Sequence, residues 1–142
     1  MQMNSLWEKT AALPRRDPLP GDRYADTVII GGGLAGILTA YELGRQGVDA
    51  LVLEARQVGS GQTGRSTAKV TSQHGLIYHR LLLQLGEDAA RQYARANEQA
   101  IQDYRRLIRE AGIDCQWKEC PAYLYSTGEE EPLRREAEAA RR

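Results

Sequence analysis

The sequence of 142 residues has no phenylalanine and only two cysteines, and its formal net charge is zero. Two cysteines cannot build the disulfide framework of a small secreted domain. Without an excess of basic residues, composition gives no support for nucleic-acid binding or for attraction to an anionic membrane surface. No apolar run approaches the roughly 20 residues needed to span a bilayer. The polar, proline-bearing amino terminus also lacks the apolar core of a secretory signal, so we expect a cytoplasmic protein.

The residue patterns along the sequence predict that the chain has three parts. Residues 1–25 are interpreted as an N-terminal arm, because three prolines within seven residues prevent a persistent helix or central strand. Residues 26–79 are predicted to form a β-α-β unit followed by a loop. Residues 80–142 are predicted to contain a helical segment, a short hairpin and a last helix. The fold class is therefore α/β.

The β-α-β unit is predicted from hydrophobic patterning. A short β-branched run at 27–30 ends in three glycines, which is typical of a buried parallel strand. Apolar residues then recur at helical spacing over 34–46, and Gly47 is a natural residue to end that helix. A second buried strand is predicted at 50–53. The short crossover implies a parallel, right-handed connection.

The strongest motif is the G-x-G-x-x-G pattern GGGLAG at 31–36, because it lies between a predicted strand and a predicted helix. Gly31 permits the tight turn, Gly33 lets a pyrophosphate approach the backbone, and Gly36 lets helix and strand pack closely. The helix N-terminus offers unpaired N–H groups to phosphates. Glu54, eighteen residues after Gly36, can accept hydrogen bonds from an adenosine ribose. The pattern predicts a dinucleotide site.

The fingerprint alone leaves both FAD and NAD open. An acidic residue at the end of the second strand disfavours NADP, whose 2′-phosphate it would repel. The Gly, Ser and Thr-rich loop at 56–75 is long for a structureless connection, which indicates a functional loop. The position of the fingerprint and this loop favour FAD, and an NAD-binding module or dehydrogenase is the alternative.

The second half of the chain carries helical patterning. Helical spacing over 80–111 predicts a helical segment that Gly86 divides into a short and a long helix. Two short strands are predicted at 113–120 and 122–126, with Trp117, Tyr123 and Tyr125 in the core. A charged segment at 129–142 is again helical, with acids in its first turn and arginines in its last.

The segment VIIGGGLAGILTAYELGRQGVDALVLEA, followed by GSGQTGRSTAKVTSQHG, resembles the start of the FAD-dependent amine and amino-acid oxidoreductases. This is the family of D-amino-acid oxidase, glycine oxidase and sarcosine oxidase. The segments TGRSTAKVTSQHGLIY and SLWEKT are similar to the sequences of a bacterial subgroup that often carries a C-terminal Rieske iron–sulfur domain. The resemblance implies an FAD/NAD(P)-binding doubly wound (Rossmann-like) domain, of which this chain is the N-terminal portion, followed by the start of a substrate domain.

The resemblance also implies a site and a reaction. Glycines and helix-start residues would face the FAD pyrophosphate, one acid with its neighbours would hold the ribose, and small loop residues would line pyrophosphate and flavin. These residues are Gly31, Gly33, Leu34, Ala35 and Gly36; Glu54, Ala55 and Arg56; and Ser60, Gly61, Thr63 and Thr67. The full protein would oxidise the C–N bond of a small amine or amino-acid substrate by hydride transfer to flavin. The electron acceptor stays unassigned.

The remaining chemistry-bearing residues carry no assigned role. For His74 and His79 we expect hydrogen bonding or no role rather than covalent attachment of FAD. Cys115 and Cys120 lack the spacing of a zinc or Rieske site, so we expect buried, inert thiols and no metal. No catalytic residue is assigned. A third hypothesis is a truncated chain, inactive without a C-terminal part, because a two-stranded sheet leaves exposed edges and the last helix has no cap.

Overall fold

The computed structural model describes residues 5–11, 13 and 15–142. Residues 1–4, Ala12 and Pro14, which belong to the predicted arm, lie outside the described part. The chain divides into two compact units, residues 1–68 and residues 69–142. Among the described residues, no helix combines the length and apolar character that crossing a membrane would require.

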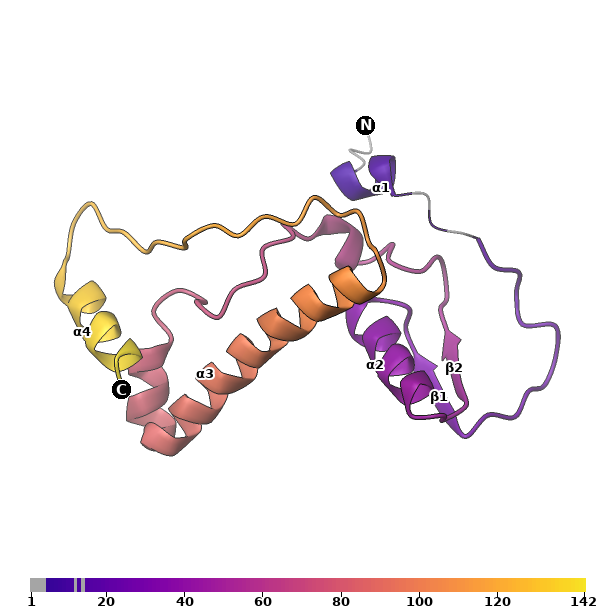
Figure 1. Cartoon of the computed structure of the whole chain (residues 1–142), viewed down its shortest axis with the longest axis horizontal. Coiled ribbons are helices and arrows are strands. Elements are labelled where there is room, and N and C mark those ends of the chain that lie inside the picture. The colour runs from indigo at the N-terminus through magenta and orange to yellow at the C-terminus, as the bar shows by residue number, and fades with distance from the viewer. Residues whose placement is uncertain (1–4, 12, 14) are drawn as a thin grey trace. The chain divides into compact units, whose positions relative to one another are not determined.

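The first unit contains the predicted β-α-β arrangement (Figure 1). Strand β1 covers Thr27–Ile30, helix α2 covers Leu34–Arg45 and strand β2 covers Ala50–Leu53. The strands pair in parallel, and each residue of β1 lies opposite one of β2, from Thr27 with Ala50 to Ile30 with Leu53. The predicted strands and their parallel connection are confirmed, and the helix ends one residue earlier than predicted.

The two-stranded sheet is covered unevenly. On the α2 side, the Ile29 side chain lies close enough to Gly36 of α2 to exclude a bulkier residue there. The opposite face is open, with Val28 51% exposed and Ile30 89% exposed. Because strand side chains alternate between faces, β1 half-buries Ile29 against α2 and leaves its other two apolar residues, Val28 and Ile30, exposed.

A short helix precedes the prolines of the arm. Helix α1 covers Leu6–Thr10, and the 3-10 helix η1 covers Thr63–Arg65. The Trp7 indole Nε1 donates a 2.7 Å hydrogen bond to the carbonyl oxygen of Ser66, which ties the two elements together. The arm prediction is corrected here: a helix of little more than one turn forms upstream of the prolines because a tertiary contact holds it.

Helix α3 dominates the second unit and covers Tyr78–Glu110. Gly86 has φ 82° and ψ 173°, so the helix is broken there as predicted, and the two parts meet at a bend (Figure 1). The end of the helix is closed by Gly112, whose φ of 59° lets the chain turn back. The N–H of Ile113 then bonds to the carbonyl oxygen of Ile108 at 2.9 Å.

Helix α4 covers Glu131–Ala140 and contacts α3. Its Glu136 is only 4% exposed. One carboxylate oxygen, Oε1, accepts hydrogen bonds from the N–H groups of Ile77 and Tyr78 at 2.9 and 2.8 Å, and Oε2 accepts from His79 at 2.9 Å. The N-terminus of α3 is therefore capped by a side chain from the other helix.

The hairpin expected at 113–126 is wrong, because the described chain forms no strand there. A hairpin strand needs backbone hydrogen bonds to a neighbouring strand, and Pro121 has no backbone N–H to donate one. The aromatic residues expected in the core are also misplaced, with Tyr123 79% exposed and Tyr125 85% exposed. Only Trp117 is half-buried.

Candidate dinucleotide-binding site

The glycine turn joins β1 to α2 and brings their backbones close together. Gly31 has φ 105°, a conformation that favours glycine, and its N–H donates a 2.7 Å hydrogen bond to the carbonyl oxygen of Leu53. A Cβ atom on Gly36 would collide with the carbonyl oxygen of Gly31 and lie 3.3 Å from Cγ2 of Ile29. Two of the three fingerprint glycines thus have an observed steric reason to be glycine.

The N-terminus of α2 opens at the end of this turn. No acidic residue lies in its first turn, so its positive dipole end is not neutralised within the helix. The N–H of Leu34 donates to Oγ1 of Thr63 at 2.9 Å. That hydroxyl lies 3.4 Å from where a Cβ of Gly33 would stand. Because a hydroxyl can accept one hydrogen bond and donate another, Thr63 keeps a donor for an anion.

Glu54 lies immediately after β2 and is held by backbone donors. Its Oε2 accepts from the N–H of Gly32 at 2.8 Å, and its Oε1 accepts from the N–H of Arg56 at 2.9 Å. These hydrogen bonds, first from Gly32 and then from Arg56, lower the pKa of the Glu54 carboxyl, with the Arg56 charge acting in the same direction. Glu54 is thus an oriented carboxylate at neutral pH.

These elements surround an open cavity of about 410 Å³. Ligand sites commonly have volumes of about 300–1,000 Å³. The cavity brings together most of the predicted site residues, namely Gly31, Gly33, Leu34, Ala35, Gly36, Glu54, Arg56, Gly61 and Thr63. The sequence pattern therefore identified residues from the glycine turn, the end of β2 and the loop that the fold gathers at one place.

Three predicted residues do not line this cavity. Ala55 and Thr67 are exposed, and the N–H of Ser60 bonds to the carbonyl oxygen of Gln57 at 3.0 Å. Other residues were missed by the sequence reasoning: Ile30, Gly59 and Gln62 line the cavity, and Gly32 holds Glu54. For Gly32, its place in the middle of three consecutive glycines was a visible signal, whereas Ile30 looked like any strand residue.

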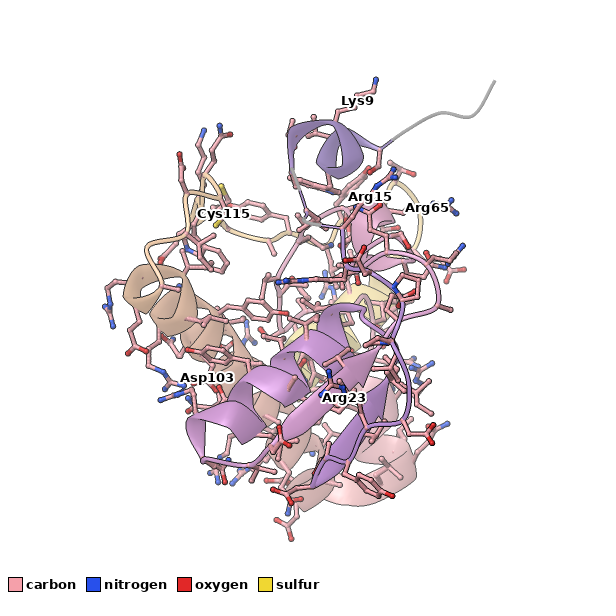
Figure 2. The ribbon with its side chains drawn as sticks, turned by 90° about the vertical axis from the view of Figure 1, so that its right-hand side faces the viewer. Lys9, Arg15, Arg23, Arg65, Asp103 and Cys115 are labelled. Carbon is pink, nitrogen blue, oxygen red and sulfur yellow. The ribbon has the colours of Figure 1, made fainter. Side chains whose placement is uncertain are left out.

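The residues without assigned roles lie in the second unit. Nδ1 of His74 lies 3.0 Å from the Tyr93 hydroxyl, and the two rings meet edge to face. The expected burial of the thiols is wrong, because Cys115 and Cys120 are both exposed and unpaired in the described chain. Figure 2 shows Cys115 beyond the end of α3, in the segment that forms no ladder. No group of metal-ligating side chains occurs among the described residues.

A glycine turn, a helix N-terminus and an acidic residue at the end of the second strand form the arrangement of dinucleotide-binding β-α-β units. A family model described as "FAD dependent oxidoreductase" (DAO) matches residues 26–142. The chain belongs to this family, which confirms the resemblance found in the fingerprint and loop. Its members are oxidoreductases by that description.

Individual relatives support the same grouping. The chain is 42% identical over 125 residues to the "Putative Rieske 2Fe-2S iron-sulfur protein YhfW" of Bacillus subtilis, covering 88% of this chain and 25% of that protein. It is 32% identical over 107 residues to the "Probable oxidoreductase OrdL" of Haemophilus influenzae, covering 75% and 25%. It is 28% identical over 102 residues to the "Gamma-glutamylputrescine oxidoreductase" of Escherichia coli, covering 72% and 24%.

The chain thus spans about a quarter of the length of these relatives. No solved structure matches the chain. The similarity to YhfW agrees with the bacterial subgroup named from the sequence.

Proposed function

We propose that residues 26–79 bind the ADP half of FAD, and that residues 80–142 lead into a substrate domain. The single observation that carries the proposal is the cavity in which the α2 N-terminus and the Glu54 carboxylate face the same space. A diphosphate suits the N-terminus, because the helix dipole and unpaired N–H groups favour an anion. A ribose suits the carboxylate, which accepts hydrogen bonds from hydroxyl groups.

The proposed contacts follow this division. Gly31, Gly33, Leu34, Ala35 and Gly36 hold the diphosphate, because Gly33 presents no side chain to the phosphate oxygens and Gly36 lets α2 pack against the turn. Glu54 holds the ribose, with Ala55 and Arg56 beside it. Ser60, Gly61, Thr63 and Thr67 line the diphosphate and the flavin ring. Of this last group, Thr63 has the clearest support, because its hydroxyl lies at the first N–H of α2.

FAD supplies a hydride acceptor when it is bound, and the residues of this chain bind and orient it. We propose that the whole protein oxidises the C–N bond of a small amine or amino acid. The similarity to a gamma-glutamylputrescine oxidoreductase supports an amine substrate class. The electron acceptor and the catalytic residues stay unassigned. A cytoplasmic location stays a prediction, to be tested by cell fractionation.

We propose further that β1 and β2 begin a larger doubly wound sheet. The support is physical, because Ile30 is 89% exposed and Val28 is 51% exposed on a face that a complete sheet of this class buries. The chain of 142 residues alone is accordingly expected to bind FAD weakly and to have no turnover. A chain that holds stoichiometric flavin and forms peroxide with an amine would contradict this.

The decisive test is binding of flavin to the purified chain. FAD fluorescence is titrated with the chain in the presence and absence of excess ADP and of NAD. We expect FAD to bind more tightly than NAD, and excess ADP to compete with either, because both dinucleotides carry the ADP half that the site is proposed to hold. The variant Glu54→Gln should bind FAD about tenfold more weakly, as expected for weakening a hydrogen bond to a charged group. Binding of NAD without FAD would instead support the NAD-binding alternative.

A further inference from the structure

Gly32 is the one glycine of the turn to which the fingerprint assigns no role, yet it is buried. Its φ lies outside the left-handed region that Gly31 adopts. An alanine could therefore adopt its backbone conformation without strain. Conformational freedom does not account for glycine at this position, and the reason must be space.

The space around Gly32 is filled by the side chain of Glu54 and the loop that follows it. A Cβ atom on Gly32 would lie 3.1 Å from Cβ of Glu54, 3.3 Å from its Cγ and 3.1 Å from Cγ2 of Val58. These separations are shorter than ordinary van der Waals contacts of about 3.5–4.0 Å. Cβ of Glu54 is fixed to the backbone of its strand end and cannot rotate away, so Glu54 and the turn would have to move apart by a few tenths of an ångström.

The backbone of Gly32 is bonded on both sides. Its N–H donates to Oε2 of Glu54 at 2.8 Å, and its carbonyl oxygen accepts from the N–H of Gly59 at 2.9 Å. Gly32 therefore links the glutamate to the loop that also contributes Gly59 to the cavity. A side chain here would disturb the glutamate and leave the diphosphate side of the turn in place.

We propose that Gly32 is a positioning residue, whose missing side chain and N–H together aim the Glu54 carboxylate at the ribose diol of an adenosine dinucleotide. The proposal rests on the proposed function for its ligand. Each carboxylate oxygen already accepts one backbone hydrogen bond, and a carboxylate has about four lone-pair sites. The carboxylate therefore keeps an acceptor on each oxygen for two adjacent hydroxyl groups.

The test compares ADP with inorganic pyrophosphate, because only ADP carries the ribose. Calorimetric titrations of the full chain are run with Gly32→Ala and with Gly44→Ala as a matched control, since nothing lies within 4 Å of a Cβ on Gly44. We expect Gly32→Ala to weaken ADP binding about tenfold and to leave pyrophosphate binding unchanged, as for one lost hydrogen bond to a charged group. An equal loss for both probes would show a merely structural role and overturn the proposal.

A second measurement needs no ligand. The titration of the Glu54 side-chain carbon is followed by NMR in the unliganded chain. Hydrogen bonds to Gly32 and Arg56 lower the pKa of Glu54, and we expect Gly32→Ala to move it back toward the ordinary value of 4.5. An unchanged pKa would overturn the positioning role. Failure of the wild-type chain to bind ADP would instead refute the proposed function, while this titration still decides the role of Gly32.

Poor folding of Gly32→Ala is addressed by a double variant. Val58→Ala removes the Cγ2 atom that a new Cβ would meet at 3.1 Å, but the contact with Cβ of Glu54 remains. Gly32→Ala combined with Val58→Ala is therefore expected to fold and still to show the selective loss of ADP binding. Full recovery of ADP binding in the double variant would assign the effect to Val58 packing and overturn the proposal.

Discussion

The close approach of α2 to the end of β1 makes Gly36 the most sensitive position of the unit. In Gly36→Ala, the new Cβ would overlap the carbonyl oxygen of Gly31 and lie 3.2 Å from its carbonyl carbon and 3.3 Å from Cγ2 of Ile29. The obstacle is mostly backbone, so the helix must shift rather than a side chain rotate. Overpacking of this kind costs about 1–3 kcal/mol. We expect the upper end of that range.

Alanine also favours the helix, and this gain has to be subtracted. Replacing a glycine inside a helix by alanine stabilises it by about 0.5–1 kcal/mol. The net loss for Gly36→Ala is then about 2 kcal/mol. Gly44→Ala in the same helix meets no atom within 4 Å and should show only the gain. The two substitutions are chemically identical, so their difference isolates the close approach.

The assay is urea unfolding of both variants followed by circular dichroism, together with FAD titration. We expect the midpoint to fall for Gly36→Ala and to rise for Gly44→Ala, and FAD binding to be lost only in the first. Equal midpoints for the two variants would refute the argument that helix–strand contact requires glycine at position 36. Retained FAD binding in Gly36→Ala would refute the role of this turn in the site.

Three further predictions concern ionisable groups. Glu136→Gln removes the charge that caps α3 through three N–H groups. We therefore expect a loss of about 1–3 kcal/mol in unfolding free energy and faster hydrogen exchange at 77–79. The control Glu138→Gln, at an exposed position of α4, should change neither. Because hydrogen bonds lower the pKa of Glu54, its contribution to stability is present above the ordinary value of 4.5 and is lost as pH falls through the lower folded value. Glu54→Gln should therefore flatten the acid limb of a stability–pH curve, and an unchanged limb would contradict this. Burial raises the pKa of Tyr78 from its ordinary value of 10.0, so the stability that the protonated Tyr78 contributes is lost as pH rises above that value. Tyr78→Phe should therefore reduce the loss of thermal stability at alkaline pH. An undiminished loss would contradict this role of Tyr78.

Local patterns predicted the elements whose causes are local. The strands at Thr27–Ile30 and Ala50–Leu53 follow from short β-branched or aliphatic runs, and the break at Gly86 follows from the conformation that glycine permits. The hairpin at 113–126 was mispredicted because strand patterning describes a surface that fits a partner, and the described chain provides no partner ladder. Helix α1 was missed because it depends on the Trp7 contact with Ser66.

The residues of the candidate site also divide into those that the sequence predicted and those that it did not. Gly31, Gly33, Gly36 and Glu54 were found because the fingerprint encodes a turn, a close approach and an acceptor at fixed spacing. The contribution of Gly32 was not found, because its N–H and its missing Cβ matter only when Glu54 folds back over the turn. Residue spacing in the sequence shows which residue types follow one another, but not which of their atoms come into contact in the folded chain.

The sequence by itself determined the β-α-β unit, its glycine turn and the family to which the chain belongs, since each of these depends on residue types at short separations. Tertiary structure decided which donors hold the Glu54 carboxylate and which helix start receives the Glu136 carboxylate, 57–59 residues away along the chain. The physical reason is that a buried or oriented charge is stable only where separate N–H groups converge on it. That convergence is a property of the folded chain.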